Sequence, residues 1–259
     1  RGGEGTLTIG ANAQVLAERG YYSVGRIPET GEDVVYNNGK LFRVSRSGET
    51  EIAYTVVTKD TGWLDVGKWY VVKGIVNRSD TLSVHEGQAA NLVLLHGAAL
   101  TIDCAWKSDP DGFDSWAGIS VKSGCALNIF GVESGALTAI GSSLAAGIGG
   151  SYHLPFLWPV IDNCGTVTIN GGTVTARGGA NSAGIGGGDK GAGGTVTING
   201  GRVEAVGNNA AAIGAGCRND AAGTLEVGPR VFKLDDNHWQ EGVFVTFDIP
   251  PGLKLVSAK

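Results

Sequence analysis

The feature that most constrains the fold of this chain is a string of amino acids that recurs. GTVTINGG occupies residues 165–172 and again residues 194–201, and a degenerate copy, GTLEVG, begins at Gly223, one further period along the chain. Alanine-glycine stretches stand between or before these copies, at residues 146–150, 183–187 and 211–215. A fixed period of about 20–50 residues indicates a solenoid, a propeller or an array of small modules.

The pattern inside the repeated unit separates these architectures. Thr-Val-Thr-Ile alternates with period two, as a strand with one buried face does, and the unit has no run of helix formers at helical spacing. A unit of about 29 residues is too short for a propeller blade, which takes about 40–45. Three short strands and three turns fit one unit. The sequence therefore predicts an all-β chain wound as a right-handed parallel β-helix of about six coils.

Alignment of the copies predicts two columns of inward side chains, each receiving one residue per coil. The first column is predicted to be Val72, Ile102, Ile129, Ile169, Ile198 and Val227. The second, two positions earlier, is predicted to be Tyr70, Leu100, Leu127, Val167, Val196 and Leu225. The alanine-glycine stretches align in the same way and place Ile119 one coil before Ile148. The 44 glycines among 259 residues fit tight turns and closely stacked coils.

The same pattern divides the chain into three parts. Residues 63–232 are predicted to form the β-helix. Residues 1–62 are predicted to be either an irregular start of the helix or a small packed β module, with a hairpin turn at Asn37-Asn38-Gly39. Residues 233–259 are predicted to be a β cap that covers the edge of the last coil.

Composition and motifs exclude several function classes. A net charge of −5, from 20 basic and 25 acidic residues, argues against a nucleic-acid partner. No stretch approaches about 18 consecutive apolar residues, so membrane insertion is not expected. The four cysteines form no CxxC pair, which excludes the common zinc-ribbon spacings, and we expect most of them to be buried thiols.

Catalytic chemistry has little support in the sequence. A nucleophile elbow, a P-loop and a metal-like pair of histidines are absent, so no catalytic and no metal-binding residue is predicted. Aspartates recur before the strands, at Asp162, Asp189 and Asp220. Stacked turns could pair such carboxylates for acid–base work on glycosides, but turn aspartates are common for backbone reasons, and we favour that interpretation. The sequence leaves enzyme activity open and favours a protein without it.

Two loops that interrupt the repeat are the candidate ligand-binding sites. The first contributes Trp106, Asp109, Asp111, Asp114 and Trp116. The second is an insertion that lengthens its coil, and it contributes Tyr152, His153, Phe156 and Trp158. Aromatic rings on proline-stiffened loops are typical of surfaces that stack on sugar rings. Because the two loops lie on neighbouring coils, they could share one sugar.

Other interpretations of these loops stay open. The second loop, residues 151–159, could instead fold back over a coil face or form a contact between subunits of an oligomer. The first loop has part of a calcium-loop pattern at Asp109, Asp111 and Asp114, but no glutamate stands at the twelfth position. No cofactor is predicted, and calcium remains an alternative.

The motifs together resemble a known group of proteins. WYVVKG at residues 69–74, ALTI at residues 99–102, AGIGG and GTVTINGG resemble glycine-rich tandem-repeat proteins of bacterial surfaces, an adhesin-like or carbohydrate-binding parallel β-helix family. The resemblance covers roughly residues 63–228. Two departures are that only two copies are near-perfect and that an insertion interrupts one coil.

The resemblance implies secretion or display at the cell surface, and contact with a glycan. We therefore expect a bacterial secreted or cell-surface protein that serves adhesion or glycan recognition through its aromatic loops. Its partner would be a glycan or another ligand on a host or cell surface. The alternatives are a carbohydrate-active β-helix enzyme, such as a lyase or glycosidase, and a passive stalk or spike.

Overall fold

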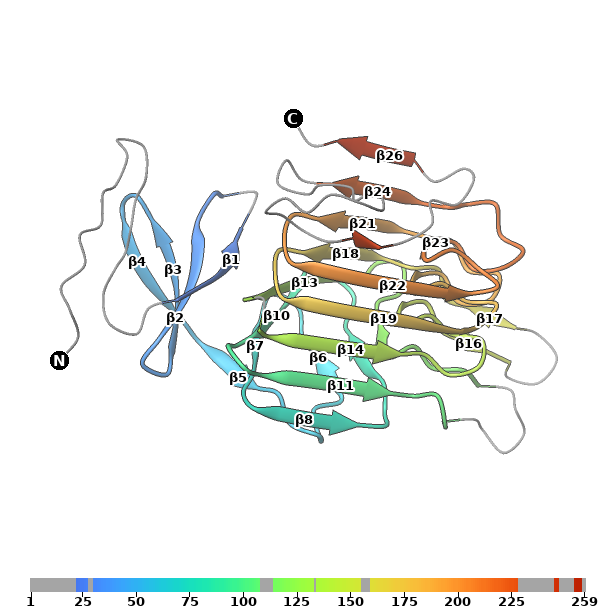
Figure 1. The fold of residues 1–259 in the computed structure, drawn as a ribbon, viewed down its shortest axis with the longest axis horizontal. Coiled ribbons are helices and arrows are strands. Elements are labelled where there is room, and N and C mark those ends of the chain that lie inside the picture. The colour runs from blue at the N-terminus through green and yellow to red at the C-terminus, as the bar shows by residue number, and fades with distance from the viewer. Residues whose placement is uncertain are drawn as a thin grey trace.

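The protein is a parallel β-helix with a small antiparallel sheet beside it (Figure 1). The structure is a computed structural model and describes residues 22–27, 30–107, 114–132, 134–154, 159–227, 245–246 and 254–257. The predicted all-β fold and its stacked parallel strands are confirmed. No helix in these ranges is long and apolar enough to cross a membrane.

Three parallel sheets form the walls of the solenoid, and each coil between β7 and β23 contributes one strand to each wall. The first sheet has eight strands: β5 (Tyr54–Val56), β7 (Trp69–Val72), β10 (Ala90–Leu94), β13 (Ala126–Gly131), β18 (Thr166–Ile169), β21 (Thr195–Ile198), β24 (Thr224–Val227) and β26 (Lys254–Ser257). The second sheet has six: β8 (Ile75–Arg78), β11 (Ala99–Asp103), β14 (Ala136–Ile140), β19 (Thr173–Ala180), β22 (Arg202–Asn208) and β25 (Val245–Thr246). The third sheet also has six: β6 (Trp63–Leu64), β9 (Leu82–Val84), β12 (Ile119–Ser120), β15 (Ile148–Gly149), β20 (Ile185–Gly186) and β23 (Ile213–Gly214).

The repeated string sets the register of the first sheet. Ile129, Ile169, Ile198 and Val227 are register partners in successive strands, and so are the residues two positions earlier, from Leu127 to Leu225. Ile169 and Ile198 are fully buried, whereas Thr168 between the columns is partly exposed. Ile119, Ile148, Ile185 and Ile213 stack in the same way in the third sheet. The predicted columns are correct from Leu127 onward.

The first two positions of each predicted column are wrong. Tyr70 pairs with Leu92, and Leu92 pairs with Ile129, so the first column runs through Tyr70 and Leu92 and not through Val72 and Ile102. Leu100 and Ile102 belong to β11 in the second sheet, where Leu100 pairs with Leu137. The step from Tyr70 to Leu92 is shorter than one regular repeat, and the step from Leu92 to Ile129 is longer. The assumption of equal spacing therefore hid a short coil followed by a long one.

The small antiparallel sheet explains why the sequence pattern does not reveal the first positions of the columns. Its strands run in the order β1 (Tyr22–Arg26), β2 (Asp33–Asn37), β3 (Lys40–Ser45) and β4 (Gly48–Ile52). It packs on the outer face of the first sheet, where a Cβ added to Gly25 would lie 3.0 Å from the Phe130 ring. The outward residues Val71, Val93 and Phe130 are consequently buried as well. Strands buried on both faces show no alternation of polar and apolar residues.

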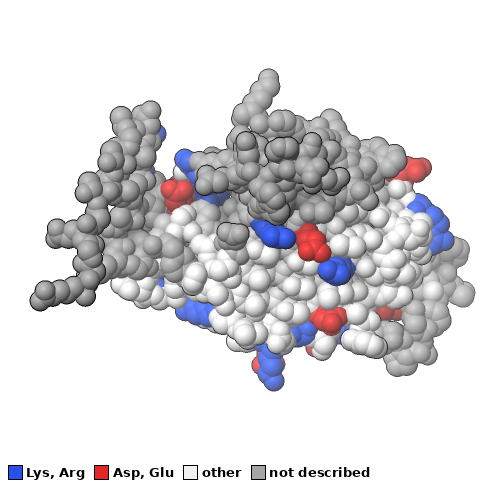
Figure 2. Space-filling model, in the orientation of Figure 1, with Lys and Arg blue, Asp and Glu red and all other residues white. Residues whose placement is uncertain are grey.

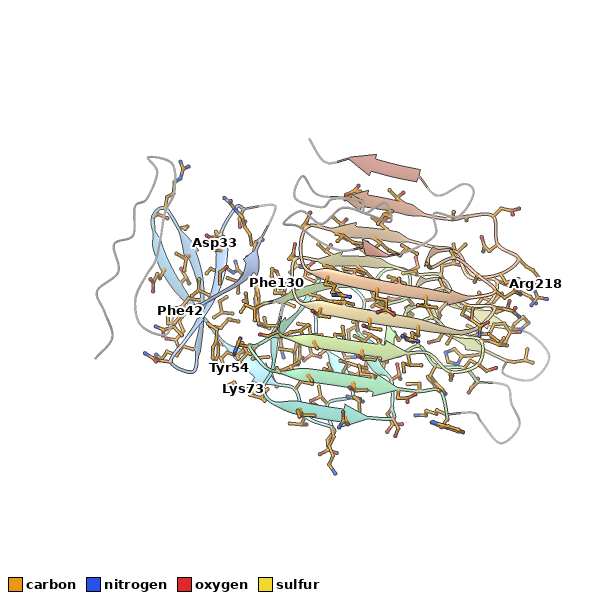
Figure 3. The ribbon with its side chains drawn as sticks, in the orientation of Figure 1. Asp33, Phe42, Tyr54, Lys73, Phe130 and Arg218 are labelled. Atoms are coloured by element: carbon orange, nitrogen blue, oxygen red, sulfur yellow. The ribbon has the colours of Figure 1, made fainter. Side chains whose placement is uncertain are left out.

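The junction of the two sheets is held by a lysine between two tyrosines. The Lys73 Nζ lies 5.5 Å from the centre of the Tyr36 ring and 4.8 Å from that of Tyr54, and it donates a hydrogen bond of 2.7 Å to the Tyr54 hydroxyl. Figure 3 shows Tyr54 and Lys73 together at the edge of the solenoid that faces the antiparallel sheet, with Phe130 further along the same edge. Tyr36 comes from β2 and Tyr54 from β5, so this contact ties the antiparallel sheet to the first coil.

The AGIGG motif has a steric cause. Gly149, Gly186 and Gly214 are register partners in the third sheet, with φ of 136°, 142° and 139°. A Cβ on Gly186 would lie 1.9 Å from the carbonyl oxygen of Gly214 in the next coil. Only glycine combines this backbone conformation with so close an approach.

The ends of the chain are described only in part. Strand β5 is part of the first sheet, so solenoid pairing begins before residue 63, the start predicted for the β-helix. Strands β25 and β26 pair in parallel with β22 and β24 and extend the second and first sheets. The rest of the predicted cap, residues 233–259, lies outside the described residues.

Candidate functional site

Two long connections leave the solenoid on either side of the third sheet. Residues 104–118 connect β11 to β12, whereas the later passage from β14 to β15 needs only residues 141–147. Residues 150–165 connect β15 to β18, whereas the passage from β20 to β21 needs only residues 187–194. The second insertion contains a hairpin of β16 (Tyr152–His153) and β17 (Val160–Ile161). Figure 1 shows this hairpin at the side of the solenoid opposite the antiparallel sheet.

The two insertions meet through their backbones. Ser115 and Tyr152 form an antiparallel bridge, with N–H···O distances of 2.7 and 3.0 Å. The buried Ser151 hydroxyl accepts a hydrogen bond of 3.0 Å from the Ala117 amide, and Ser142 accepts one of 2.7 Å from the Trp116 amide. These contacts join segments that belong to different coils. They hold the side chains of both loops in one place.

His153 lies at the centre of this meeting point. Its ring centre is 4.6 Å from that of Trp116 at an interplanar angle of 64°, an edge-to-face contact. Its Nδ1 is 3.3 Å from an Asp114 carboxylate oxygen, and its Nε2 is 3.7 Å from an oxygen of Asp162. The imidazole is thus flanked by two carboxylates, and the three side chains together present hydrogen-bond donors and acceptors beside an aromatic ring. We refer to Asp114, Trp116, His153 and Asp162 as the loop cluster.

Asp162 is the group of the loop cluster with a perturbed acidity. Its carboxyl is half-buried, and burial raises its pKa, while electrostatic interactions with His153 and Lys122 act in the opposite direction. A carboxyl of this kind holds its proton to higher pH than a solvated aspartate. Such a group can donate a hydrogen bond as well as accept one.

An exposed tryptophan directly precedes a lysine that contacts the loop cluster. Trp106 is 91% exposed, the most exposed large apolar residue in the described part of the chain. The next residue, Lys107, places its ammonium 5.6 Å from the centre of the Trp116 ring and forms an ion pair with Asp80. Lys107 therefore links the loop cluster to the neighbouring coil.

The structure brings together part of the predicted site. Asp114, Trp116, Tyr152 and His153 lie at the contact between the loops, but Tyr152 is 8% exposed and contributes its backbone bridge more than its ring. Trp106 is exposed and precedes Lys107, whose ammonium contacts the Trp116 ring. The other four predicted residues, Asp109, Asp111, Phe156 and Trp158, lie outside the described residues.

The structure adds side chains that sequence reasoning did not place here. The sequence predicts Asp162 as one of several recurring acids, with a turn role favoured over pairing between coils, and it gives no role to Lys107 or Lys122. The idea that recurring acids pair between coils does not hold for Asp189, because its carboxylate binds Arg218 at 2.8 and 3.0 Å. Asp162 contacts a histidine from its own insertion instead. Within the described ranges, no three His, Cys, Asp or Glu residues are placed to hold a metal ion.

Comparison with known proteins supports the architecture. The family model described as a beta helix repeat matches residues 167–189 and 193–217, which run from β18 into the turn after β20 and through the following coil. No curated protein and no solved structure matches the chain significantly. The matched residues are the regular coils, and neither insertion is among them.

Proposed function

We propose that this β-helix is a carbohydrate-recognition protein, secreted or displayed on a bacterial cell surface, and that the two insertions form its binding site. The single observation that carries the proposal is the meeting of the two insertions at the His153–Trp116 contact. Regular coils vary little in their chemistry, so departures from the repeat are where a solenoid gains specificity.

The chemistry of the loop cluster suits a sugar. Carbohydrates present apolar C–H faces and a rim of hydroxyl groups, so their sites combine an aromatic ring with side chains that donate and accept hydrogen bonds. Trp116 and the exposed Trp106 supply rings. Asp114, His153 and Asp162 supply hydrogen-bonding groups that are already held by one another. Ordering of these side chains before binding reduces the entropic cost of recognition.

The charge of the molecule favours a ligand without strong net charge. On the face shown in Figure 2, the described surface carries few charged side chains, and both signs are mixed. At the loop cluster, the carboxylates of Asp114 and Asp162 lie near Lys107 and Lys122, which pair with Asp80 and Glu86, so both signs of charge are mixed here too. A polyanion or polycation would meet groups of its own sign here.

Binding to a printed panel of neutral and acidic oligosaccharides tests the proposal. We expect specific binding by the full chain, and at least about tenfold weaker binding by Trp116→Ala and Trp106→Ala, since aromatic anchors dominate such interfaces. Ile75→Ala is the matched control, because Ile75 is 76% exposed on β8 in the second sheet. A panel without specific binding, or one on which all three variants behave alike, would favour the passive stalk and contradict the proposal.

A carbohydrate-active enzyme is a second candidate that one observation favours. Two carboxylates flank His153, and burial raises the pKa of one of them, Asp162, as general acids of glycoside chemistry require. The same panel, incubated with the protein and analysed for shorter sugars, separates the two candidates. Product formation that Asp162→Asn abolishes without loss of binding supports the enzyme. Unchanged sugars support recognition alone.

A further inference from the structure

A second exposed aromatic side chain lies on the third sheet, outside both insertions. Trp63 of β6 is 56% exposed, whereas its neighbour Leu64 is buried in the solenoid. The Trp63 ring is stacked on the His85 ring with centres 4.4 Å apart and an interplanar angle of 12°. His85 follows β9, the next strand of the sheet. The two stacked rings therefore come from neighbouring coils.

The stack is held in place by a charged pair. His85 Nδ1 lies 3.0 Å from one oxygen of Asp65, and the Lys68 ammonium donates a hydrogen bond of 3.0 Å to the other. Lys68 and His85 hold the pKa of the Asp65 carboxyl below its usual range, so the carboxylate is charged when it positions the imidazole. An exposed ring fixed in this way is ordered before any ligand arrives.

A line of contacts connects this stack to the loop cluster. Glu86 follows His85 directly, and its carboxylate is 3.9 Å from the Lys122 ammonium. Lys122 in turn forms an antiparallel β-bridge with Cys164, two residues after Asp162, and Asp162 contacts His153. The line crosses the coils from β6 through β9 and β12 to the hairpin after β15. Trp116 precedes β12, which is two strands from β6, so about 10 Å separates Trp63 from Trp116 along the solenoid axis.

From this arrangement we infer that the Trp63–His85 stack is a second sugar subsite, and that one linear, uncharged oligosaccharide extends from it to the loop cluster. The inference rests on the proposed function and specifies which class of carbohydrate the protein binds. Glu86 and Lys122 lie between the two subsites and carry opposite charges. They can hydrogen-bond to the hydroxyl groups of a neutral sugar, whereas Glu86 would repel an acidic one. The stack alone would bind a short sugar weakly, because it offers one ring and few hydrogen-bonding groups.

Length dependence of binding tests the inference. The probes are di- to hexasaccharides of β-1,4-linked glucose, xylose and mannose, titrated calorimetrically into the full chain. For the series that binds, we expect affinity to rise with length up to a chain that reaches both subsites. Trp63→Ala should remove that rise, weakening the longest probe about tenfold while the shortest probe that binds the loop cluster is unaffected. Ile75→Ala serves again as the control for loss of an exposed apolar side chain.

The variants distinguish failure of the inference from failure of the proposed function. If Trp116→Ala weakens every length and Trp63→Ala changes none, the second subsite is wrong and the first stands. If Trp63→Ala weakens all lengths equally, the stack serves a structural purpose and the extended site is also wrong. If no probe binds and the glycan panel is blank, both are wrong. Thermal unfolding of each variant, expected to match the parent because Trp63 is exposed, excludes misfolding as the cause.

Discussion

Arg218 donates hydrogen bonds of 3.0 and 2.8 Å to the two carboxylate oxygens of Asp189, in the equivalent turn of the preceding coil. The Asp189 side chain is 3% exposed, whereas that of Arg218 is 59% exposed. Figure 3 shows Arg218 on the side of the solenoid away from the antiparallel sheet. The buried carboxylate thus depends on a partner that reaches it from the surface of the next coil.

Removal of this partner should destabilise the solenoid. We expect Arg218→Ala to lower the thermal midpoint, because it leaves the buried Asp189 charge unpaired. Asp189→Asn in the same chain should recover part of the loss, since it removes that charge. Differential scanning calorimetry of the two single variants and the double variant measures the coupling. Strict additivity of the two effects would contradict the pairing.

The inward column of the first sheet should carry much of the stability. Ile198→Ala removes a fully buried side chain that stacks between Ile169 and Val227, and we expect a loss of about 2–5 kcal/mol in the free energy of unfolding. Thr168→Ala is the control, because that residue points outward and is partly exposed. Its effect should stay within about 0.5 kcal/mol. Urea unfolding followed by circular dichroism gives both values, and similar losses would refute the inward assignment.

The stacked glycines of the third sheet should tolerate no side chain. Gly186→Ala combines a backbone conformation that alanine rarely adopts with a Cβ 1.9 Å from the Gly214 oxygen. We expect a cost of about 3 kcal/mol or more, or failure to fold. Gly62→Ala is the matched control, because nothing lies within 4 Å of the added carbon. Soluble expression and thermal unfolding compare the two, and a stable Gly186→Ala protein would show that the coils are less closely stacked.

Stability should depend on pH through Asp162. Burial raises the pKa of this carboxyl above its ordinary value of 3.8, so the folded state binds the proton more tightly than the unfolded state. The contribution of Asp162 to the free energy of unfolding is therefore fully present below pH 3.8, and it is lost as pH rises through the pKa of Asp162 in the folded state. In Asp162→Asn this loss should disappear. Urea unfolding at several pH values tests it, with the exposed Asp220 replaced in Asp220→Asn as control, which should keep the parent's pH dependence.

The thiols should differ sharply in reactivity. Burial raises the pKa of Cys104 to about 11 and that of Cys164 to about 12, and it also raises the pKa of Cys125. Cys217 is only partly buried. Because thiolates are the reactive species, we expect a disulfide reagent such as Ellman's to label Cys217 in the native protein and the other three only after unfolding. Cys217→Ser should abolish native labelling, and residual fast labelling would contradict the buried positions.

Much of the fold could be predicted from the sequence where a strand has one face exposed to solvent and the other buried. Thr-Val-Thr-Ile alternates because Thr168 meets solvent and Ile169 the interior, so the strands from residue 126 onward were aligned correctly. The alternation is lost in β7 and β10, where the antiparallel sheet also covers the outer face and residues such as Val71 and Val93 are buried. Packing between the two sheets produces no periodic pattern in the sequence of either sheet from which it could be predicted. The early strands were therefore assigned to the wrong columns.

The candidate site was predictable only as a pair of irregular loops. Departures from the repeat pointed to Trp116 and His153, but their contact depends on the hairpin folding back to Ser115, which no local pattern encodes. The role of Asp162 was found only in the structure, because it follows from the path of the hairpin. Trp63 was missed for a different reason. It lies in a regular strand, and its importance comes from stacking on a residue of the next coil.

The register between Ile169, Ile198 and Val227 has an evolutionary consequence. Because each winding presents the same buried surface above and below, duplication of residues 194–222 within the gene would add one more turn without disturbing its neighbours. Such an event would move β24 and later residues outward by about one strand spacing and leave both insertions where they are. The rod can thus change length independently of the chemistry at its side.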